Sequence, residues 1–217
     1  MPGENHNSTE EHKAEALAPA EYFQRLVKLI PQLPFPAIEA IADVILQAYE
    51  KNQTVFVFGN GGSAASASHM MVDMNKGTGE PVAGKRLKVM ALTDNVPLLT
   101  AWANDSSYER VFAEQLKNFV QRGDVAFAIS GSGDSANVVL ALETARERGA
   151  VTVGISGYSG GKMKAYCDIC AVVPSNNMQM IEDMHHSILH SIFIAVRENM
   201  ASRKPRTMAA VTGRLQK

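Results

Sequence analysis

The chain has 217 residues, of which 46% are hydrophobic, and this supply of apolar side chains suits one substantial globular core. Its 21 Lys and Arg residues nearly balance 22 Asp and Glu residues, and the formal net charge of -1 argues against a surface built as a whole to attract nucleic acid or an acidic membrane. No apolar run approaches the roughly 20 residues that span a bilayer, and the N-terminus lacks the apolar stretch of a secretory signal. We therefore expect a soluble, cytoplasmic protein with no membrane or nucleic-acid partner.

Cys167 and Cys170 are the two cysteines of the chain. They are too few for a disulfide framework, and no second pair or neighbouring His completes a structural zinc site. Because free cysteine is usually buried, we predict two buried thiols in or beside a strand.

The patterning divides the chain into three regions. Residues 1–19 are polar without a sustained apolar period and predict a flexible N-terminal arm. Apolar residues recur at helical spacing from Tyr22 to Ile30 and from Ile38 to Glu50, so we expect a helical pair at the start of a single domain over residues 20–199. Residues 200–217 carry basic and no acidic side chains and predict a solvated tail, with contact to phosphate or a partner as the alternative.

From residue 54, short apolar runs alternate with stretches long enough for helices. The runs predict strands at 54–59, 87–92, 124–130, 151–156 and 168–174, and the stretches between them predict helices at 64–76, 107–121, 135–148 and 179–199. Continuous hydrophobicity in the strands indicates burial on both faces. We expect an α/β fold, a three-layer sandwich around a five-stranded parallel sheet of flavodoxin-like type, with ligands beyond the carboxyl ends of the strands.

Two of the predicted strands end in loops suited to an anion. Residues 59–63 read GNGGS and residues 130–135 read SGSGDS, each directly before a predicted helix. Glycines let the backbone approach a ligand closely, and the free N–H groups at a helix start favour negative charge. Two such turns at one sheet edge predict a phosphorylated ligand, whereas the glycine patterns of nucleotide and dinucleotide sites are absent from the sequence.

A third strand end carries Thr93, Asp94 and Asn95. Their hydroxyl, carboxylate and amide groups suit a polyol chain. A capped turn before the next helix is an equally good interpretation.

Histidines and carboxylates gather on two predicted helices. His69 and Asp73 are four residues apart and so lie on one helix face, where they suit a metal or an acid–base pair. Glu182, His186 and His190 share one side of the last helix, on which we expect His185 to be a core residue with satisfied hydrogen bonds. Because Glu182 and His190 lie about 12 Å apart along a continuous helix, Glu182 reaches the same metal only from a frayed helix start, and otherwise His186 is the better second ligand.

Taken in order, these motifs resemble those of the sugar isomerase (SIS) domain proteins and, within them, the phosphoheptose isomerases, from about residue 20 to 199. The resemblance rests on GNGGS at 59–63, the following helix through His69 and Asp73, TDN at 93–95, AND at 103–105, SGSGDS at 130–135, GYSGGKM at 157–163 and the helix from Glu182 to His190. It implies an SIS-type fold and the interconversion of sedoheptulose 7-phosphate with D-glycero-D-manno-heptose 7-phosphate.

The resemblance also implies residue roles. It places the phosphate on Ser130, Gly131, Ser132 and Ser135, sugar hydroxyls on Thr93 with Asp94 or Asn95, and further substrate contacts on Asn60, Gly61, Gly62, Ser63, Asp73 and Glu182. It places one zinc ion per subunit on His69, Asp73, Glu182 and His190, with Asp73 as general base and His190 as general acid. It further implies homotetramers with active sites at the subunit interfaces.

Two positions depart from the family pattern. The family's base is normally Glu, whereas Asp73 is one methylene shorter, and a misplacement of about 1 Å can cost on the order of a hundredfold in rate. The family's Gln is here Glu182, which gives a ligand set of two histidines and two carboxylates that can still take zinc. Both changes keep the type of chemistry and leave the sugar open.

The favoured reaction is an aldose–ketose isomerisation through an enediol, in which Asp73 removes the proton beside the carbonyl and His190 moves a proton to or from oxygen. The alternative is a non-catalytic sugar-phosphate sensor or assembly protein on the same fold, similar to the bacterial replication-initiator-associating protein. That relative lacks a carboxylate at the position of Asp73, so the presence of Asp73 with His190 favours an enzyme. A metal hydrolase is a third and more distant possibility.

Overall fold

The computed structural model describes residues 18–78 and 85–202. Nearly all of the predicted N-terminal arm and most of the predicted basic tail therefore lie outside the described residues. The N-terminal helical pair is confirmed: α1 (Pro19–Leu29) and α2 (Phe35–Glu50) are joined by the 3-10 turn η1 (Ile30–Gln32).

Helices and strands alternate after this pair, as predicted. The strands are β1 (Thr54–Gly59), β2 (Lys88–Ala91), β3 (Val125–Ser130), β4 (Val151–Ser156) and β5 (Ile169–Val172). The helices are α3 (Gly62–Gly77), α4 (Val96–Asp105), α5 (Ala113–Phe119), α6 (Ala136–Glu147) and α7 (Met178–Ser202). Two further 3-10 turns, η2 (Tyr108–Arg110) and η3 (Lys162–Tyr166), complete the described chain.

The five strands form one parallel sheet in the order β2-β1-β3-β4-β5, which confirms the predicted fold class. In this register Val55 of β1 lies between Val89 of β2 and Val125 of β3. After β1 the chain moves outward to β2 and then returns to the other side of β1 to form β3. The strand order therefore reverses between β1 and β3, and the crevice outside their carboxyl ends is the place where such sheets bind ligands.

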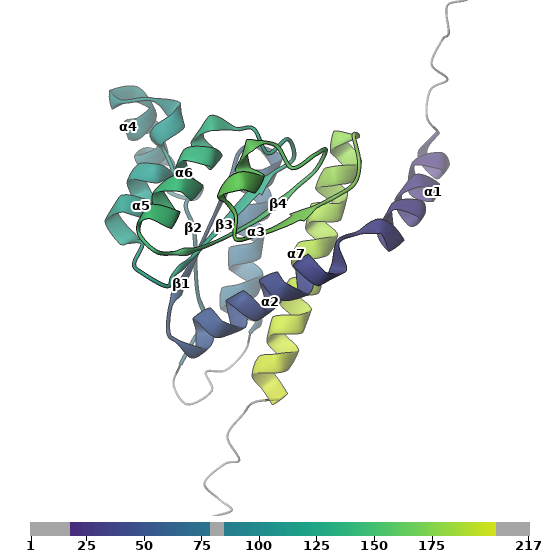
Figure 1. Cartoon of the computed structure of the whole chain (residues 1–217), viewed down its shortest axis with the longest axis horizontal. Helices are drawn as coiled ribbons and strands as arrows, with labels where there is room; N and C mark the ends of the chain where they lie inside the picture. Colours follow the sequence, from purple (N-terminus) through teal and green to yellow (C-terminus); the bar gives the residue numbers. More distant parts are fainter. Residues whose placement is uncertain (1–17, 79–84, 203–217) are drawn as a thin grey trace, which may run out of the picture.

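Helices cover both faces of the sheet (Figure 1). Alternate residues of β1 point to opposite faces: Val55 and Val57 join a core with α2, α3 and α7, whereas Phe56 and Phe58 join a core with α5 and α6. All four side chains are buried, and burial of each stabilises the fold by roughly 1.5–3 kcal/mol. This two-sided burial explains the continuous hydrophobicity of the strands.

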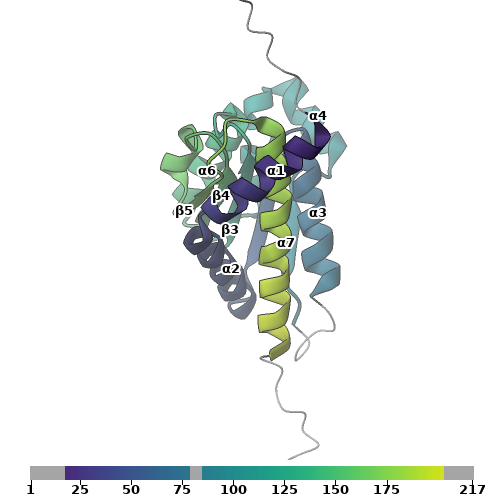
Figure 2. The same cartoon turned by 90° about the vertical axis from the view of Figure 1, so that its right-hand side faces the viewer.

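The helices α3 and α7, far apart in the sequence, run side by side on the same face of the sheet (Figure 2). Small residues of α3 permit this approach. At Gly77 an added Cβ would lie 2.5 Å from the Phe193 ring of α7, and Ala67 is completely buried in the shared core. The two helices that carry His69, Asp73 and His190 are thereby brought together.

The predicted helix at 107–121 is wrong in its extent. Ser107 has an extended backbone, with φ of -161° and ψ of 158°, and the segment breaks into η2 and α5. A helix that was not predicted, α4, precedes it, and its start is marked by Asn95 as N-cap and by Pro97 in the first turn. The last helix was predicted at 179–199 and continues to Ser202.

The two cysteines lie within and directly before β5, as predicted, but both are half-buried rather than fully buried. A hydrogen bond from Cys167 lowers the pKa of the Cys170 thiol to about 7.

No single helix among the described residues is both long and apolar enough to cross a membrane. The adjoining segments Pro19–Gln32 and Phe35–Glu50, bent by 72°, meet that test only when taken together.

Candidate active site

A pocket opens at the carboxyl ends of β1 and β3, where the strand order reverses. Its empty volume is about 390 Å³. We call it the switch-point pocket, and its walls are Asn60, Ser63, Ile129, Ser130, Gly131, Ser132, Ser135, Met178 and Glu182. Six of these residues come from the two loops that the sequence predicted to bind an anion, so the structure brings both loops to one site.

The serine-rich loop after β3 forms a compact turn. Within it, Gly133 N donates to Ser130 Oγ at 3.1 Å and Asp134 N donates to Ser132 Oγ at 3.2 Å. Ser135 is the N-cap of α6, yet its side chain makes no capping hydrogen bond. The Ser135 hydroxyl and the N–H groups at the start of this 12-residue helix are therefore available to an anion.

The loop is fixed from behind by the segment after β4. An added Cβ at Gly133, whose φ is +72°, would lie 2.1 Å from the carbonyl oxygen of Gly160. An added Cβ at Gly161 would lie 2.4 Å from the carbonyl carbon of Gly133. Met163 N also donates to Gly133 O at 2.9 Å. The two loops interlock so closely that both glycines are required.

The glycine loop after β1 begins α3. Gly61, with φ of +53°, takes a conformation that favours glycine. An added Cβ on Gly62 would lie 3.0 Å from the Glu182 carboxylate of α7. Glu182 thus faces the glycine loop and the switch-point pocket.

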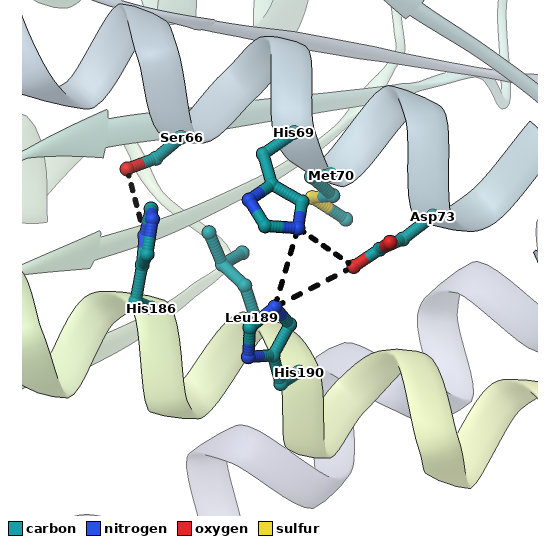
Figure 3. A pocket seen from close by; sticks show the side chains of 7 residues that line it. All are labelled: Ser66, His69, Met70, Asp73, His186, Leu189 and His190. Atoms are coloured by element: carbon teal, nitrogen blue, oxygen red, sulfur yellow. Dashed lines mark hydrogen bonds and ion pairs between the residues drawn. The ribbon is translucent and has the colours of Figure 1, made fainter.

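A second, smaller pocket lies between α3 and α7, and we call it the histidine pocket (Figure 3). His69 Nε2 lies 3.4 Å from Asp73 Oδ2, and His190 Nε2 lies 3.6 Å from the same oxygen. The two imidazole nitrogens are 3.3 Å apart. Asp73 is three-quarters buried while both histidines are about half exposed, so the group is open to a ligand.

These three donor atoms suit a divalent metal ion, because all lie within 4.8 Å of one another. A tetrahedral zinc ion with bonds of about 2.0–2.1 Å separates its ligand atoms by roughly 3.4 Å. The observed separations of 3.3, 3.4 and 3.6 Å match that spacing. Three protein ligands leave one position open, as catalytic zinc sites do.

The structure does not bring Glu182 into this group. It precedes His190 by eight residues of a continuous helix, which places it about 12 Å away along the axis. His186, the other candidate, lines the histidine pocket, but its Nδ1 lies 3.1 Å from Ser66 Oγ. His185 is buried in the core as expected, yet neither ring nitrogen has a hydrogen-bond partner, and burial lowers its pKa to about 4.

Thr93, Asp94 and Asn95 lie at the end of β2 and line neither pocket. Ser68 of α3 lies 3.2 Å from Thr93 Oγ1 and also donates to Asp94. The Asn95 side chain accepts a hydrogen bond from Leu98 N at 3.1 Å. The capped-turn interpretation therefore describes Asn95, while Thr93 and Asp94 hold α3 against the sheet edge.

The two pockets follow one another along α3 and α7. On α3, Ser63 lines the switch-point pocket and His69 lines the histidine pocket. The separation of six positions corresponds to about 9 Å along the helix axis. On α7, Glu182 and His186 follow the same direction one turn apart. An extended ligand with an anionic end could therefore contact both pockets.

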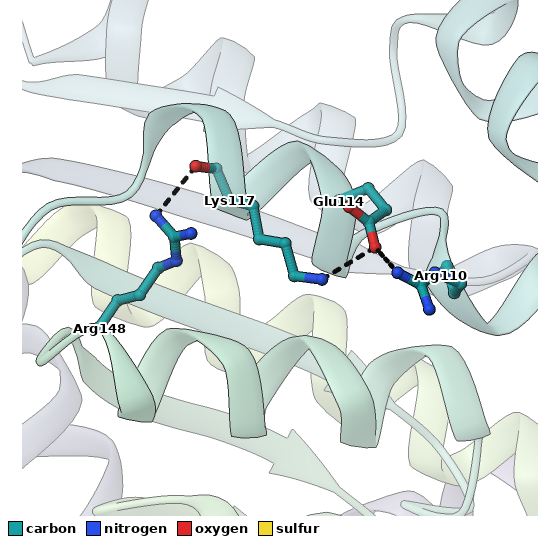
Figure 4. Close-up of polar contacts among 4 residues, drawn as sticks. All are labelled: Arg110, Glu114, Lys117 and Arg148. Carbon is teal, nitrogen blue, oxygen red and sulfur yellow. Dashed lines mark hydrogen bonds and ion pairs between the residues drawn. The ribbon is translucent and has the colours of Figure 1, made fainter.

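A polar cluster on the opposite face of the sheet fixes η2 next to the site (Figure 4). The nearly buried Glu114 carboxylate accepts hydrogen bonds from Arg110 and, at 2.9 Å, from Lys117 Nζ. Arg148 Nη1 of the α6 C-cap donates to Lys117 O at 2.9 Å. The hydrogen bond from Lys117, followed by that from Arg110, lowers the pKa of Glu114.

We expect Glu114→Gln to lower the free energy of unfolding by about 1–2 kcal/mol at pH 7, because charge-assisted hydrogen bonds to a nearly buried carboxylate are lost. Since the folded state lowers the pKa of Glu114, its contribution is complete above the ordinary pKa of 4.5 and disappears as the pH falls through the folded value. Urea unfolding of the wild type and the variant at several pH values between 7 and 3 would measure this difference in the free energy of unfolding. Glu147→Gln, on the exposed surface of α6, should leave stability nearly unchanged, and an equal loss at all pH values would contradict the assignment.

Two side chains of the site were not among the predicted site residues. Asn137 of α6 and Tyr108 of η2 both hydrogen-bond Asn60. Asn137 follows the serine loop, so its place in the sequence is a usable signal. No signal in the sequence marks Tyr108, because its position depends on the break between α4 and α5, which the apolar pattern did not reveal.

Comparison with known proteins gives a family match over most of the described chain. A family model described as SIS domain matches residues 20–157. The phosphoheptose isomerase of Helicobacter hepaticus is 38% identical over 156 residues, which is 71% of this chain and 78% of that protein. The phosphoheptose isomerase of Geobacter sp. strain M21 is 40% identical over 158 residues, 72% of this chain and 81% of that protein.

Comparison with solved structures leads to the same family. A phosphoheptose isomerase from Francisella tularensis superposes with a TM-score of 0.77 at 28% identity, covering 82% of this chain and 96% of that chain. Phosphoheptose isomerase GmhA from Neisseria gonorrhoeae gives a TM-score of 0.75 at 30% identity with the same coverage.

Proposed function

Because the chain belongs to the SIS-domain family and, within it, to the phosphoheptose isomerases, we propose that it interconverts sedoheptulose 7-phosphate and D-glycero-D-manno-heptose 7-phosphate at the site between α3 and α7. The observation that carries this proposal is the meeting of Asp73, His69 and His190 beside the serine-lined pocket. A carboxylate and an imidazole at one point are what proton transfer between neighbouring carbons requires.

The serine loop would bind the phosphate. Ser130, Ser132 and Ser135 line the switch-point pocket, and the start of α6 adds free N–H groups. An extended chain gains roughly 1.2 Å per bond, so the second carbon of a heptose 7-phosphate lies about 8–9 Å from its phosphorus. That length is similar to the axial separation of about 9 Å between Ser63, which lines the switch-point pocket, and His69, which lines the histidine pocket. The reacting carbons would then lie at the histidine pocket.

Asp73 would act as the base. Its Oδ2 faces both imidazoles, which leaves Oδ1 to take the proton from the first carbon of the ketose and return it to the second carbon. His190 would carry the hydroxyl proton between the two oxygens through Nδ1, because its Nε2 would hold the metal, and the enediol would collapse to the aldose without loss or gain of atoms. Binding of the distant phosphate positions these carbons.

His69, Asp73 and His190 would hold the metal, which we propose to be one zinc ion per subunit. A divalent ion there would polarise the carbonyl and the neighbouring hydroxyl. Glu182, which faces the switch-point pocket, would accept hydrogen bonds from sugar hydroxyls. Asn60, Gly61, Gly62 and Ser63 would contact the sugar from the glycine loop.

The direct test is to incubate the zinc-loaded full chain with sedoheptulose 7-phosphate and to follow the aldose by its anomeric proton in NMR spectra. Conversion to an equilibrium mixture is expected. Tight binding without conversion would instead identify the non-catalytic sensor, and release of inorganic phosphate would identify a hydrolase.

We also propose that the protein is a cytoplasmic homotetramer with its sites at subunit interfaces. The exposed apolar face of α1, which extends away from the sheet in Figure 1, supports this, since Phe23 and Val27 are 66% and 67% exposed. Phe23 and Val27 line a shallow hollow together with Gln24 and Lys28, where an apolar surface of another copy would pack.

We expect the double variant Phe23→Asp, Val27→Asp to dissociate the tetramer, because two carboxylates in an apolar contact lose their hydration without gaining partners. Light scattering coupled to gel filtration would give the mass. Phe119→Asp, an exposed phenylalanine of α5 on the other face of the sheet, is the matched control and should leave the mass unchanged. A monomeric wild type would contradict the proposal.

A further inference from the structure

The side-chain amide of Asn60 is held by two neighbours. Its Nδ2 donates to Asn137 Oδ1 at 2.8 Å, and its Oδ1 accepts from Asn137 Nδ2 at 2.8 Å. The Tyr108 hydroxyl donates to the same Oδ1 at 3.0 Å. A carboxamide has two acceptor and two donor positions, so both acceptor positions are used and one N–H remains. Asn60 lines the switch-point pocket, where this N–H is the group left for a ligand.

The pairing with Asn137 does not by itself fix this orientation. If both amides turned over together, each would exchange its donor and acceptor, and the same two reciprocal hydrogen bonds would form again. Asn60 would then offer an acceptor to the pocket instead of a donor. The Tyr108 hydroxyl, which can donate or accept, adds a third hydrogen bond to Asn60 and so limits movement of the amide in either orientation.

Tyr108 is held by its backbone rather than by burial of its ring, which is 59% exposed. It lies in η2, two residues before Arg110, whose guanidinium contacts the nearly buried Glu114 (Figure 4). Gln115, also buried, donates to Val111 O at 2.8 Å and to Leu92 O at 3.1 Å, which ties the turn to the end of β2. The phenol is thereby presented to Asn60 from a rigid support.

We propose that Tyr108 is a positioning residue that holds the Asn60 amide in place at the wall of the switch-point pocket, so that its remaining polar position meets a hydroxyl of the sugar. The proposal rests on the proposed function in that it takes a sugar phosphate as the ligand. It predicts that Tyr108 affects recognition of the sugar and leaves recognition of the phosphate alone.

Tyr108→Phe removes the hydroxyl and keeps the exposed ring, so the fold is retained. We expect KM for sedoheptulose 7-phosphate to rise about 3- to 10-fold, the size of one hydrogen bond, with kcat changed less than twofold. The dissociation constant of inorganic phosphate should stay the same. Tyr49→Phe, in the last turn of α2 before the amino end of β1 and so away from the pocket, is the matched control. In an Asn60→Ala background, Tyr108→Phe should add nothing, because the two changes act through one amide.

The inference is overturned if KM is unchanged, if phosphate affinity falls in parallel, or if the effects of the two substitutions add. The Asn60 side-chain amide protons in ¹⁵N-resolved NMR spectra provide a test without ligand, and they should shift in Tyr108→Phe but not in Tyr49→Phe. If Tyr108→Phe shows this shift but the wild type converts no sugar, the proposed function is overturned and the role of Tyr108 stands.

Discussion

Asp73→Asn is expected to lower kcat for sedoheptulose 7-phosphate by about 10²- to 10⁴-fold, because the amide has the shape of the carboxylate but cannot take up a proton at neutral pH. Substrate affinity should change little, since we propose that the phosphate and most sugar hydroxyls bind in the switch-point pocket. Single-turnover NMR would measure the rate, and titration of the inactive variant would measure binding.

Two further variants test whether the loss of activity comes from the missing carboxylate at position 73. Asp73→Glu restores the longer side chain that is usual at this position in the family and should keep far more activity than Asp73→Asn. Asp43→Asn, on the exposed side of α2, makes the same chemical change outside the site and should behave as wild type. Turnover by Asp73→Asn within tenfold of wild type would exclude Asp73 as the base.

Removal of the proposed zinc ion is the second change with a large expected effect. Chelation, or substitution of His69 by Ala, should release zinc and lower kcat/KM by about 10²- to 10³-fold, the loss that follows removal of one main electrostatic contribution to the transition state. The zinc content measured by mass spectrometry gives a readout that does not depend on activity.

The neighbours of the metal group serve as comparisons. Glu182→Gln should retain zinc and raise KM, because its carboxylate faces the switch-point pocket. His186→Ala should also retain zinc, because its Nδ1 is engaged by Ser66. Loss of zinc from either variant, with His69→Ala unaffected, would move the ligand set away from the group of His69, Asp73 and His190.

The fold was largely predictable because burial on both faces leaves a strong pattern in the sequence. Each of the five apolar runs became a strand, and the helices at 64–76 and 135–148 match α3 and α6 closely. The pattern failed between 93 and 121, where Asn95 suited both a sugar contact and a helix cap. Its capping of Leu98 is a local contact that periodicity does not reveal.

The site was predictable in part for the same reason. The spacing of His69 and Asp73 placed them on one face of α3, but no spacing could show that α7 lies against that face. The ambiguity between Glu182 and His186 came from knowing distances along one helix without knowing its neighbour. Tyr108 could not be found at all, because its hydroxyl reaches Asn60 through a turn whose geometry depends on the buried Glu114 and Gln115.

The interlocked glycines of the two loops have a consequence for affinity. Gly133 and Gly161 pack so closely that the serine turn is preorganised, and little conformational entropy remains to be lost when an anion enters. Tight binding of phosphate without a lysine among the residues that line the pocket is then reasonable, because the low entropy cost of binding to a preorganised turn offsets the absence of a positive charge. It also follows that the two loops must evolve as a pair, since a side chain on either glycine would force the other loop to rearrange.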